Sequence, residues 1–456
     1  MDTVVFRCSV LVNARRVGGA ATMTDRSGGD ATMNIKALVL IAALATLGPS
    51  QLRAQVVPLQ KLNINIQETS VSGLSSGGYM AVQFHVANSA IVKGAGVIAG
   101  GPYFCARDDQ NTATDICSCT GFGTCHPGQA AQTVPGLVQV TNQNTQQGAI
   151  DATSNMSTSK VWLFSGNLDS VVPPPVMDAL ETYYKNYVAA ANISFKKNIA
   201  AEHAMPTDSF GSACNVKGDP FINNCHFDAA GELLKWIYGN LNAKNPGTAS
   251  GKFIEFDQSV FLPDPANHGM SPTGWAYVPA SCQQNAACRL HIVFHGCKQY
   301  PGSSYAAGPQ GKFGDTYVKN AGYNSWADTN NLVILYPQAN AMTSNTRLPR
   351  FNPNGCWDWW GYDDGAYATK TGHQMAAVRG MVNRLAGISS PPPPPPSAGF
   401  CGSATNSAHA AAGRATAWFL WWYFAHGSND FLGLGGNQST LQETSAGSFK
   451  QVASCP

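Results

Sequence analysis

The stretch from residue 71 to residue 80, VSGLSSGGYM, constrains the fold more than any other part of the sequence. Within it, residues 73–77 fit the pattern G-x-S-x-G, in which a strand turns sharply into a helix and presents a serine. The glycines on either side of Ser75 allow the strand and the helix to approach closely. Residues 69–71 can end a strand, and residues 78–86 can begin a helix. We therefore expect a nucleophile elbow with Ser75 at its tip.

Further apolar segments, bounded by glycine or polar residues, follow this motif. The segments expected to form strands are 94–101, 160–164, 193–195, 289–297 and 331–337. The segments expected to form helices are 179–187, 229–241 and 375–385. Apolar strands that alternate with helices predict an α/β fold with a mostly parallel sheet. Residues 56–67, which precede the motif, are expected to form an edge strand or an arm.

The N-terminal residues predict export, either out of the cell or into the periplasm. Residues 33–36, MNIK, form a charged start, residues 37–47 form a short apolar segment, and residues 52–54 offer a small-residue cleavage site. The apolar segment is too short to cross a membrane as a helix. We therefore expect residues 1–54 to be an N-terminal extension with a signal peptide, and we expect no membrane span in the mature chain.

The cysteines agree with export. Twelve of the thirteen follow the predicted signal, and an even number in an exported chain indicates disulfides rather than metal ligands. Eight of them are expected in disulfides: Cys214, Cys225, Cys282, Cys288, Cys297, Cys356, Cys401 and Cys455. The other four, Cys105, Cys117, Cys119 and Cys125, leave three pairings open. A zinc site formed by three of these four with His126 is the alternative, but the spacing suits structural zinc poorly.

The C-terminal part has a different composition. Six prolines at residues 391–396 predict a stiff spacer of roughly 19 Å. The predicted domains are therefore a catalytic domain (55–388), a linker (389–398) and a small accessory module (399–456), which a Cys401–Cys455 bridge would close. In so small a module we expect the aromatic residues, Trp418, Trp421 and Trp422 among them, to lie inside; adhesion to a solid polymer is the alternative for them.

Nucleophilic catalysis by serine requires a histidine to take the hydroxyl proton and a carboxylate to orient that histidine. Asp169 follows one predicted strand and His203 follows the next, so both can project from the carboxyl edge of the sheet. The order Ser75, Asp169, His203 is the order found in α/β-hydrolases. Asp208 is the rival acid, but it follows the histidine and fits this order less well.

An oxyanion hole needs two backbone N–H groups. One is expected from Ser76, the residue after the nucleophile. The second normally comes from a strand that precedes the nucleophile, yet no such strand lies upstream of Ser75. Downstream, residues 295–297 (HGC) end an apolar strand, so we interpret the fold as circularly permuted, with the Cys297 amide as second donor. The plainer interpretation is a glycine turn that carries a disulfide, and both can hold.

Five segments together resemble the extracellular polyhydroxybutyrate depolymerases of the fungal, circularly permuted type. They are SGLSSGGYM (72–80), GNLDSVV (166–172), HAMPT (203–207), FHGC (294–297) and NGCWDWW (354–360). The resemblance extends over roughly residues 62–385. It implies Ser75 as nucleophile, Asp169 and His203 as its partners, and the amides of Ser76 and Cys297 as the oxyanion hole.

The resemblance also implies a bridge between Cys297 and Cys356. Such a bridge would place Trp357, Trp359 and Trp360 beside the catalytic site, where flat apolar side chains suit methyl-bearing ester units. Packing in the core is the alternative for each of them. The tail departs from the single-domain fungal form, which lacks it, and the tail resembles small modules on other secreted bacterial enzymes.

The predicted function is that of a secreted serine esterase acting on poly(3-hydroxybutyrate)-type polyesters, without a metal or cofactor. A carbohydrate esterase releasing acetate or ferulate is the alternative, since the same triad would serve it. A polymer-binding protein with an inactive catalytic domain is a third hypothesis, which the complete set of Ser75, Asp169 and His203 disfavours. A charged fraction of 12% and a net charge of +2 give no basic field for nucleic acid. We expect a monomer.

Overall fold

The computed structural model describes residues 56–343, 351–389, 400–411, 414–418, 422–445 and 448–455. The predicted signal peptide, the proline spacer, Trp421 and the side chain of Trp418 lie outside these ranges. Within them, no helix combines the length and the apolar character that crossing a bilayer requires.

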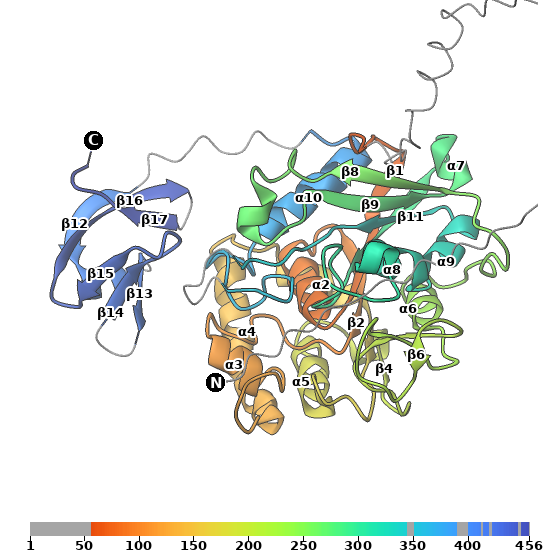
Figure 1. Cartoon of the computed structure of the whole chain (residues 1–456), viewed down its shortest axis with the longest axis horizontal. Helices are drawn as coiled ribbons and strands as arrows, with labels where there is room; N and C mark the ends of the chain where they lie inside the picture. Colours follow the sequence, from red (N-terminus) through yellow and green to blue (C-terminus); the bar gives the residue numbers. More distant parts are fainter. Residues whose placement is uncertain are drawn as a thin grey trace, which may run out of the picture. The chain divides into compact units, whose positions relative to one another are not determined.

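One eight-stranded sheet organises the described part of the chain before residue 389 (Figure 1). Its strand order is β4-β3-β2-β1-β10-β11-β9-β8. In that order the strands are Ile193–Lys196, Lys160–Phe164, Val92–Ile98, Ile64–Leu74, Cys288–Phe294, Leu332–Tyr336, Thr273–Val278 and Lys252–Asp257. Pairing is parallel from β4 to β11 and antiparallel from β11 to β8. The predicted α/β-hydrolase fold, with its mostly parallel sheet, is confirmed.

The elbow strand β1 is the first strand of the sheet in sequence, yet it lies in the middle. It pairs with β2 on one side and on the other with β10, which follows it by more than two hundred residues. The strands expected before the elbow therefore come after it, as in a circular permutation. The prediction of an edge strand or arm over residues 56–67 is wrong from Ile64 onward. Residues 64–68 are only partly covered because β2 begins to pair with β1 at Thr69.

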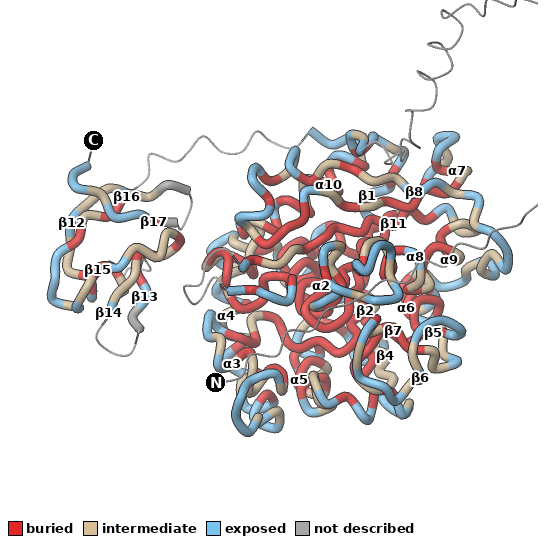
Figure 2. Tube along the Cα trace, in the orientation of Figure 1, coloured by how far each residue is buried: buried red, intermediate tan, exposed pale blue. Residues whose placement is uncertain are grey.

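Helix α2 (Ser76–Ala87) packs on β1, β2 and β10, and every one of its residues is buried. Figure 2 shows this central region as almost continuously buried. Among the other helices that pack on the sheet are α6 (Ala229–Tyr238), on β2 and β3, and α10 (His373–Ala386), on β1. All three coincide with predicted helices within a few residues.

Several helices differ from the prediction, which lacks the short helices α3 (Gln110–Asp115), α7 (Ala280–Gln283), α8 (Thr316–Asn320) and α9 (Tyr323–Thr329). Helix α5 spans Pro174–Tyr184 and begins earlier than expected because proline is compatible with the first turn of a helix. Helix α4 (Ala130–Gln146) was not predicted at all. It carries mainly Gln, Asn and Thr on its exposed side and contains Pro135, so its sequence lacks a strong apolar period.

A buried polar chain joins β1 to β10. The two ring nitrogens of His291 lie 2.6 Å from Ser70 Oγ and 2.8 Å from Ser72 Oγ. These hydroxyls also contact Tyr238 and Tyr323 at 2.6 and 2.8 Å. Burial lowers the pKa of His291 to about 3, so the ring is neutral in the folded protein.

Two further histidines are buried in the same domain. His85 on α2 contacts Tyr184 and Ser159, each at 3.1 Å, and burial lowers its pKa to about 3. His295 follows β10, and burial lowers its pKa to about 4. All three histidines therefore have to remain uncharged for the core to stay packed.

The described part of the C-terminal segment forms two three-stranded antiparallel sheets. One has the order β12-β16-β17 and the other β13-β14-β15. The strands of the first sheet are Cys401–Thr405, Gln438–Ser445 and Ser448–Gln451. Those of the second sheet are Ala415–Trp418, Trp422–Ala425 and Phe431–Leu434. Ala425 and Leu441 are buried, whereas Trp422 is 47% exposed. The prediction that Trp422 lies inside is wrong because successive strand residues point to opposite faces, and Ala425 takes the inner one.

We expect the free energy of unfolding to fall steeply below pH 6. His85, His291 and His295 have folded-state pKa values below the ordinary value of about 6.5, so the unfolded chain takes up protons first. Their contribution to stability is complete above about pH 6.5 and is lost as the pH falls through the folded-state pKa values of about 4 and about 3. Three such groups give a slope of about 4 kcal/mol per pH unit. Urea unfolding at pH 7, 6 and 5 measures it.

The variant His85→Gln keeps a hydrogen-bonding amide at this position but removes one proton-binding group. The slope between pH 6 and pH 5 should therefore decrease by about 1 kcal/mol per pH unit, the contribution of one such group. An equal slope in both proteins would show that His85 does not carry its share of the acid sensitivity.

Candidate active site

Ser75 lies between the end of β1 and the start of α2, with φ 57° and ψ −123°. A positive φ is strained for a residue with a Cβ, and such strain is typical of nucleophile elbows. The lack of room for a side chain explains why glycines flank Ser75. A Cβ on Gly73 would overlap the carbonyl oxygen of Gly77, and one on Gly77 would overlap that of Phe294. The Ser75 N–H donates to Ile98 O at 3.0 Å, which fixes the turn to β2.

The predicted acid and histidine lie at the same edge of the sheet as Ser75. The parallel strands end in register: Leu74 lies opposite Ile98, Ile98 opposite Phe164, and Phe164 opposite Lys196. Ser75 follows β1, Asp169 follows β3 and His203 follows β4. The topology thus gathers three residues that are far apart in the sequence.

Asp169 and His203 are in direct contact. His203 Nδ1 lies 2.9 Å from Asp169 Oδ2 and 3.1 Å from Oδ1, and both side chains are almost fully buried. The backbone N–H groups of Val171 and Val172 donate to Asp169 Oδ1 at 2.9 and 2.8 Å. These two bonds hold the carboxylate in place. The rival acid, Asp208, is exposed and pairs with Lys244 at 2.5 Å.

Glu202 is a residue that the sequence analysis did not single out. Its Oε2 accepts the backbone N–H of His203 at 2.7 Å and that of Ser170 at 3.3 Å, so it ties the histidine loop to the aspartate loop. Burial would raise the pKa of Glu202, but hydrogen bonds from Ser170 and from the His203 backbone outweigh burial and lower it. Its position beside His203 was the only signal in the sequence.

The side-chain amide of Gln299 joins the backbone of Gly296, which lies beside Ser75, to that of Phe221, which lies beside His203. Gln299 Oε1 accepts the N–H of Gly296 at 2.7 Å, and Gln299 Nε2 donates to Phe221 O at 3.1 Å. A Cβ on Gly296 would lie 3.3 Å from the Cβ of Ser75, and the Phe221 ring packs edge-on against His203. Among the described residues, no hydrogen bond joins Ser75 Oγ to His203. Catalytic contacts of this kind often tighten only with substrate.

Two backbone N–H groups are available to an oxyanion. Ser76 begins α2, so its N–H has no partner within the helix, and the positive end of the helix dipole lies there. The turn after β10 is held by His295, whose Nδ1–H donates to Gly296 O at 2.7 Å and whose Nε2 accepts from Ala339 N at 3.1 Å. Within the described ranges, neither Ser76 N–H nor Cys297 N–H donates a hydrogen bond.

The segment after Cys356 is attached to this turn. Cys356 is bonded to Cys297, and the Trp357 N–H donates to Ser76 Oγ at 3.3 Å. The Trp357 side chain itself has no exposed surface and packs against Phe294 at 4.9 Å. Trp357 therefore belongs to the core in this structure, in contrast to the predicted substrate contact.

Trp359 and Trp360 differ from Trp357 because they retain some exposed surface, 8% and 9%. The Trp359 ring is stacked on Tyr79 at 4.0 Å, one helical turn after Ser75. The Tyr79 hydroxyl donates to Cys117 O. Burial, and then the nearby charge of Asp169, raise the pKa of Tyr79, so this hydroxyl stays protonated.

All twelve cysteines after the predicted signal are paired in the structure. The pairs are Cys105–Cys117, Cys119–Cys125, Cys214–Cys225, Cys282–Cys288, Cys297–Cys356 and Cys401–Cys455. The alternative of a zinc site around His126 is wrong, because the cysteines it needs are disulfide-bonded. The predicted disulfide framework is present.

A serine at a nucleophile elbow, a buried histidine–aspartate pair at the same sheet edge and an α/β-hydrolase fold define a serine hydrolase. Two curated relatives identify the family. The poly(3-hydroxybutyrate) depolymerase of Delftia acidovorans is 50% identical over 355 residues, which are 77% of this chain and 66% of that protein. The polyhydroxybutyrate depolymerase of Talaromyces funiculosus is 40% identical over 360 residues, 76% of this chain and 97% of the relative. The chain belongs to the polyhydroxybutyrate depolymerase family.

Two solved structures agree with this assignment. The crystal structure of PHB depolymerase from Penicillium funiculosum has a TM-score of 0.64 and 37% identity, and it matches 73% of this chain and 100% of its own. A serine-to-alanine variant of PHB depolymerase complexed with an R3HB trimer has a TM-score of 0.63 at the same identity and coverage. No family model matches the chain. The chain spans about two thirds of the length of the Delftia relative.

The variant Asp169→Asn should lower kcat on a soluble activated ester by about 10⁴-fold with little change in KM. An amide in place of the carboxylate no longer stabilises the protonated ring and favours the wrong tautomer of His203. Asp208→Asn is the matched control, since Asp208 contacts Lys244 rather than His203, and it should stay close to the unchanged enzyme. Equal losses in both variants would contradict the assignment of Asp169.

Proposed function

We propose that this chain hydrolyses the ester bonds of poly(3-hydroxybutyrate)-type polyesters through an acyl-enzyme on Ser75. The observation that carries the proposal is the contact of 2.9 Å between His203 Nδ1 and Asp169 Oδ2 at the sheet edge where the elbow serine lies. The substrate class is supported by relatives that are named as depolymerases of this polyester. It is also supported by a structural neighbour complexed with an R3HB trimer.

The proposed reaction is acyl transfer in two halves. Ser75 Oγ attacks the ester carbonyl carbon while His203 Nε2 takes the hydroxyl proton, and Asp169 stabilises the imidazolium. The tetrahedral intermediate carries its negative charge on the former carbonyl oxygen, toward the N–H groups of Ser76 and Cys297. His203 then returns the proton to the leaving alcohol. Water activated by the same ring releases the acid and regenerates Ser75.

We propose Trp359 and Trp360 as the side chains that contact the polyester beside Ser75. Their support is the attachment of their segment to the Cys297 turn and the stacking of Trp359 on Tyr79, one turn along α2. A rigid aromatic surface contributes apolar contact at little cost in side-chain entropy. The exposed fraction of each ring is small, so the contact would be made by ring edges.

We further propose that the protein is exported and acts as a monomer with a separate C-terminal module. Six disulfides support an oxidising compartment. All proposed catalytic residues come from one chain, which supports a monomer. The module has two sheets whose strands pair only with one another, which supports its separation after the predicted linker. The alternative of a carbohydrate esterase finds no support among the relatives, which are named as polyester depolymerases.

The expected result for a suspension of poly(3-hydroxybutyrate) is clearing by the unchanged enzyme and none by Ser75→Ala. Loss of the nucleophile should lower the rate by about 10⁶-fold. Turbidity and the release of soluble 3-hydroxybutyrate products measure the reaction. Ser209→Ala, at an exposed loop position beside Asp208, is the matched serine control and should clear normally.

Two other outcomes would change the proposal. If Ser75→Ala clears the suspension as well, the nucleophile is assigned wrongly. If the unchanged enzyme leaves the polyester intact but shows Ser75-dependent hydrolysis of acetylated xylan or a feruloyl ester, the substrate class is wrong and the mechanism stands.

A further inference from the structure

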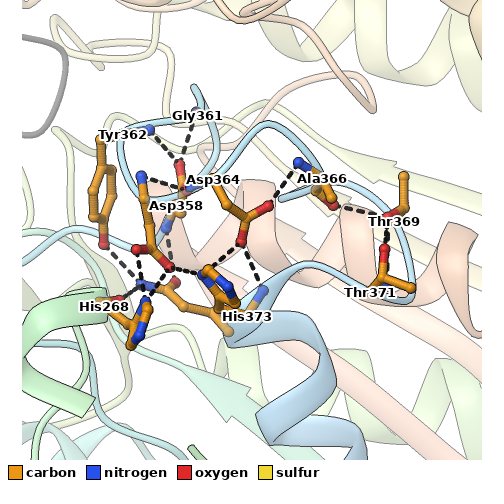
Figure 3. Close-up of polar contacts among 11 residues, drawn as sticks. His268, Asp358, Gly361, Tyr362, Asp364, Ala366, Thr369, Thr371 and His373 are labelled. Carbon is orange, nitrogen blue, oxygen red and sulfur yellow. Dashed lines mark hydrogen bonds and ion pairs between the residues drawn. The ribbon is translucent and has the colours of Figure 1, made fainter. Parts of the chain in front are cut away.

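Two histidines meet an aspartate of the segment that follows Cys356. Figure 3 shows His268 and His373 next to each other among the polar contacts of this segment. The Nδ1 atoms of His268 and His373 each lie 2.9 Å from an oxygen of Asp363, one on Oδ1 and the other on Oδ2. The two imidazole rings are 4.3 Å apart. The three potential ligand atoms lie within 4.8 Å of one another. His268 ends the turn η4 (Pro265–His268), and His373 begins α10, so three separate segments converge here.

The cluster is held from behind by groups that do not take part in it. The buried carboxylate of Asp358 accepts the backbone N–H groups of Gly361 and Tyr362 on one oxygen and that of Asp363 on the other, at 2.8 to 3.0 Å. Gln374 donates to the carbonyl oxygen of His268 at 2.7 Å. The backbones on which the three side chains stand are therefore fixed, as they are behind metal ligands.

Acidic side chains are concentrated in this segment. Asp358, Asp363 and Asp364 are all buried and lie within a few residues of one another. Among the described residues, His268 contacts Asp363, and His373 contacts both Asp363 and Asp364; both histidines are only partly buried. Burying a carboxylate without a compensating positive charge is costly. A dication bound at Asp363 would place positive charge beside these carboxyl groups.

We propose that His268, Asp363 and His373 form a structural site for a divalent transition metal of the zinc class. Two imidazole nitrogens and a carboxylate oxygen are a donor set typical of zinc and of its neighbours in the first transition row, and unlike that of calcium or magnesium. Asp364 Oδ2 lies 3.1 Å from His373 Nδ1 and is the nearest further oxygen ligand. When the metal binds, each Nδ1 loses its proton or shifts it to Nε2, and the lone pair then binds the ion.

The distances between the potential ligand atoms fit a tetrahedral zinc ion after small movements of the side chains. Tetrahedral zinc with bonds of about 2.0–2.1 Å sets its ligand atoms about 3.4 Å apart. Each histidine Nδ1 already lies closer than this to an oxygen of Asp363. The most distant pair of ligand atoms lies at most 4.8 Å apart and therefore has to approach by at most about 1.4 Å. The side chains of His268 and His373 are 26% and 28% exposed, so they have room to rotate.

The site would act on stability rather than on the chemistry. Tyr362, in the same loop, donates its hydroxyl to Cys356 O at 2.8 Å, and Cys356 is bonded to the turn that carries the Cys297 N–H. A metal would therefore join η4, this loop and α10, and it would fix the segment that supports the oxyanion turn. The ligands are distributed over residues 268–373, and the long spacing explains why no sequence pattern revealed them.

The test is a zinc titration of the purified full chain after dialysis against a chelator. We expect one equivalent of Zn²⁺ to bind by calorimetry, the melting temperature to rise with Zn²⁺, and Co²⁺ to give the visible absorption of a tetrahedral nitrogen–oxygen site. His268→Gln and His373→Gln should each weaken zinc binding by more than about 100-fold, beyond the loss typical of supporting residues. Both variants should also lose the zinc-dependent rise in melting temperature.

The controls are His126→Gln and His226→Gln, which remove exposed histidines outside the cluster and should bind zinc as the unchanged chain does. Near-ultraviolet circular dichroism without metal separates loss of the site from loss of the fold. The proposal is overturned if the unchanged chain binds no zinc saturably. It is equally overturned if both cluster variants, correctly folded, keep full affinity, or if either control abolishes binding.

Discussion

Parallel pairing of β1 with β2 and β10 is the constraint on which the rest of this structure depends. It brings the ends of strands from distant parts of the chain to one edge, and it places Ser75 where α2 must begin. The pairing is specified by close contact as much as by apolar burial, since Gly73 and Gly77 leave no space for a Cβ. The chain between β1 and β2 can therefore only turn in one way. The strain at Ser75 is sustained by the buried helix behind it.

Several buried polar groups of the core are hydrogen-bonded to one another. Neutral histidines satisfy hydroxyl and backbone groups that the strands bury, as His291 does between Ser70 and Ser72. His295 does so at the turn that presents the Cys297 N–H. Acid sensitivity is the consequence, because each of these rings must remain uncharged in the fold. The histidine proposed for catalysis is instead paired with a carboxylate, which favours a charged ring during the reaction.

The loop between Cys356 and α10 connects the two functional proposals. At one end, its disulfide attaches it to the oxyanion turn, and Trp359 stacks on the elbow helix. At the other end, Asp363 meets His268 and His373. A long loop with little secondary structure needs such attachments, because backbone order without helix or sheet is costly in entropy. Asp363 is the carboxylate of this loop that the proposed metal would bind.

Local signals in the sequence determined the elbow, the parallel strands of the main sheet and the order of Ser75, Asp169 and His203, because glycine spacing and apolar runs act over a few residues. They did not reveal the antiparallel strands β8 and β9. Contacts between residues that are far apart in the sequence could not be predicted from such local signals. The contact of Glu202 with Ser170, the core position of Trp357 and the His268–Asp363–His373 cluster depend on which strand ends and loops come together. Helix α4 and the central place of β1 were missed for a related reason. Their sequences carry weak apolar periods, and only neighbours in space bury them. Sequence thus specifies local geometry, and tertiary structure decides which distant side chains share one environment.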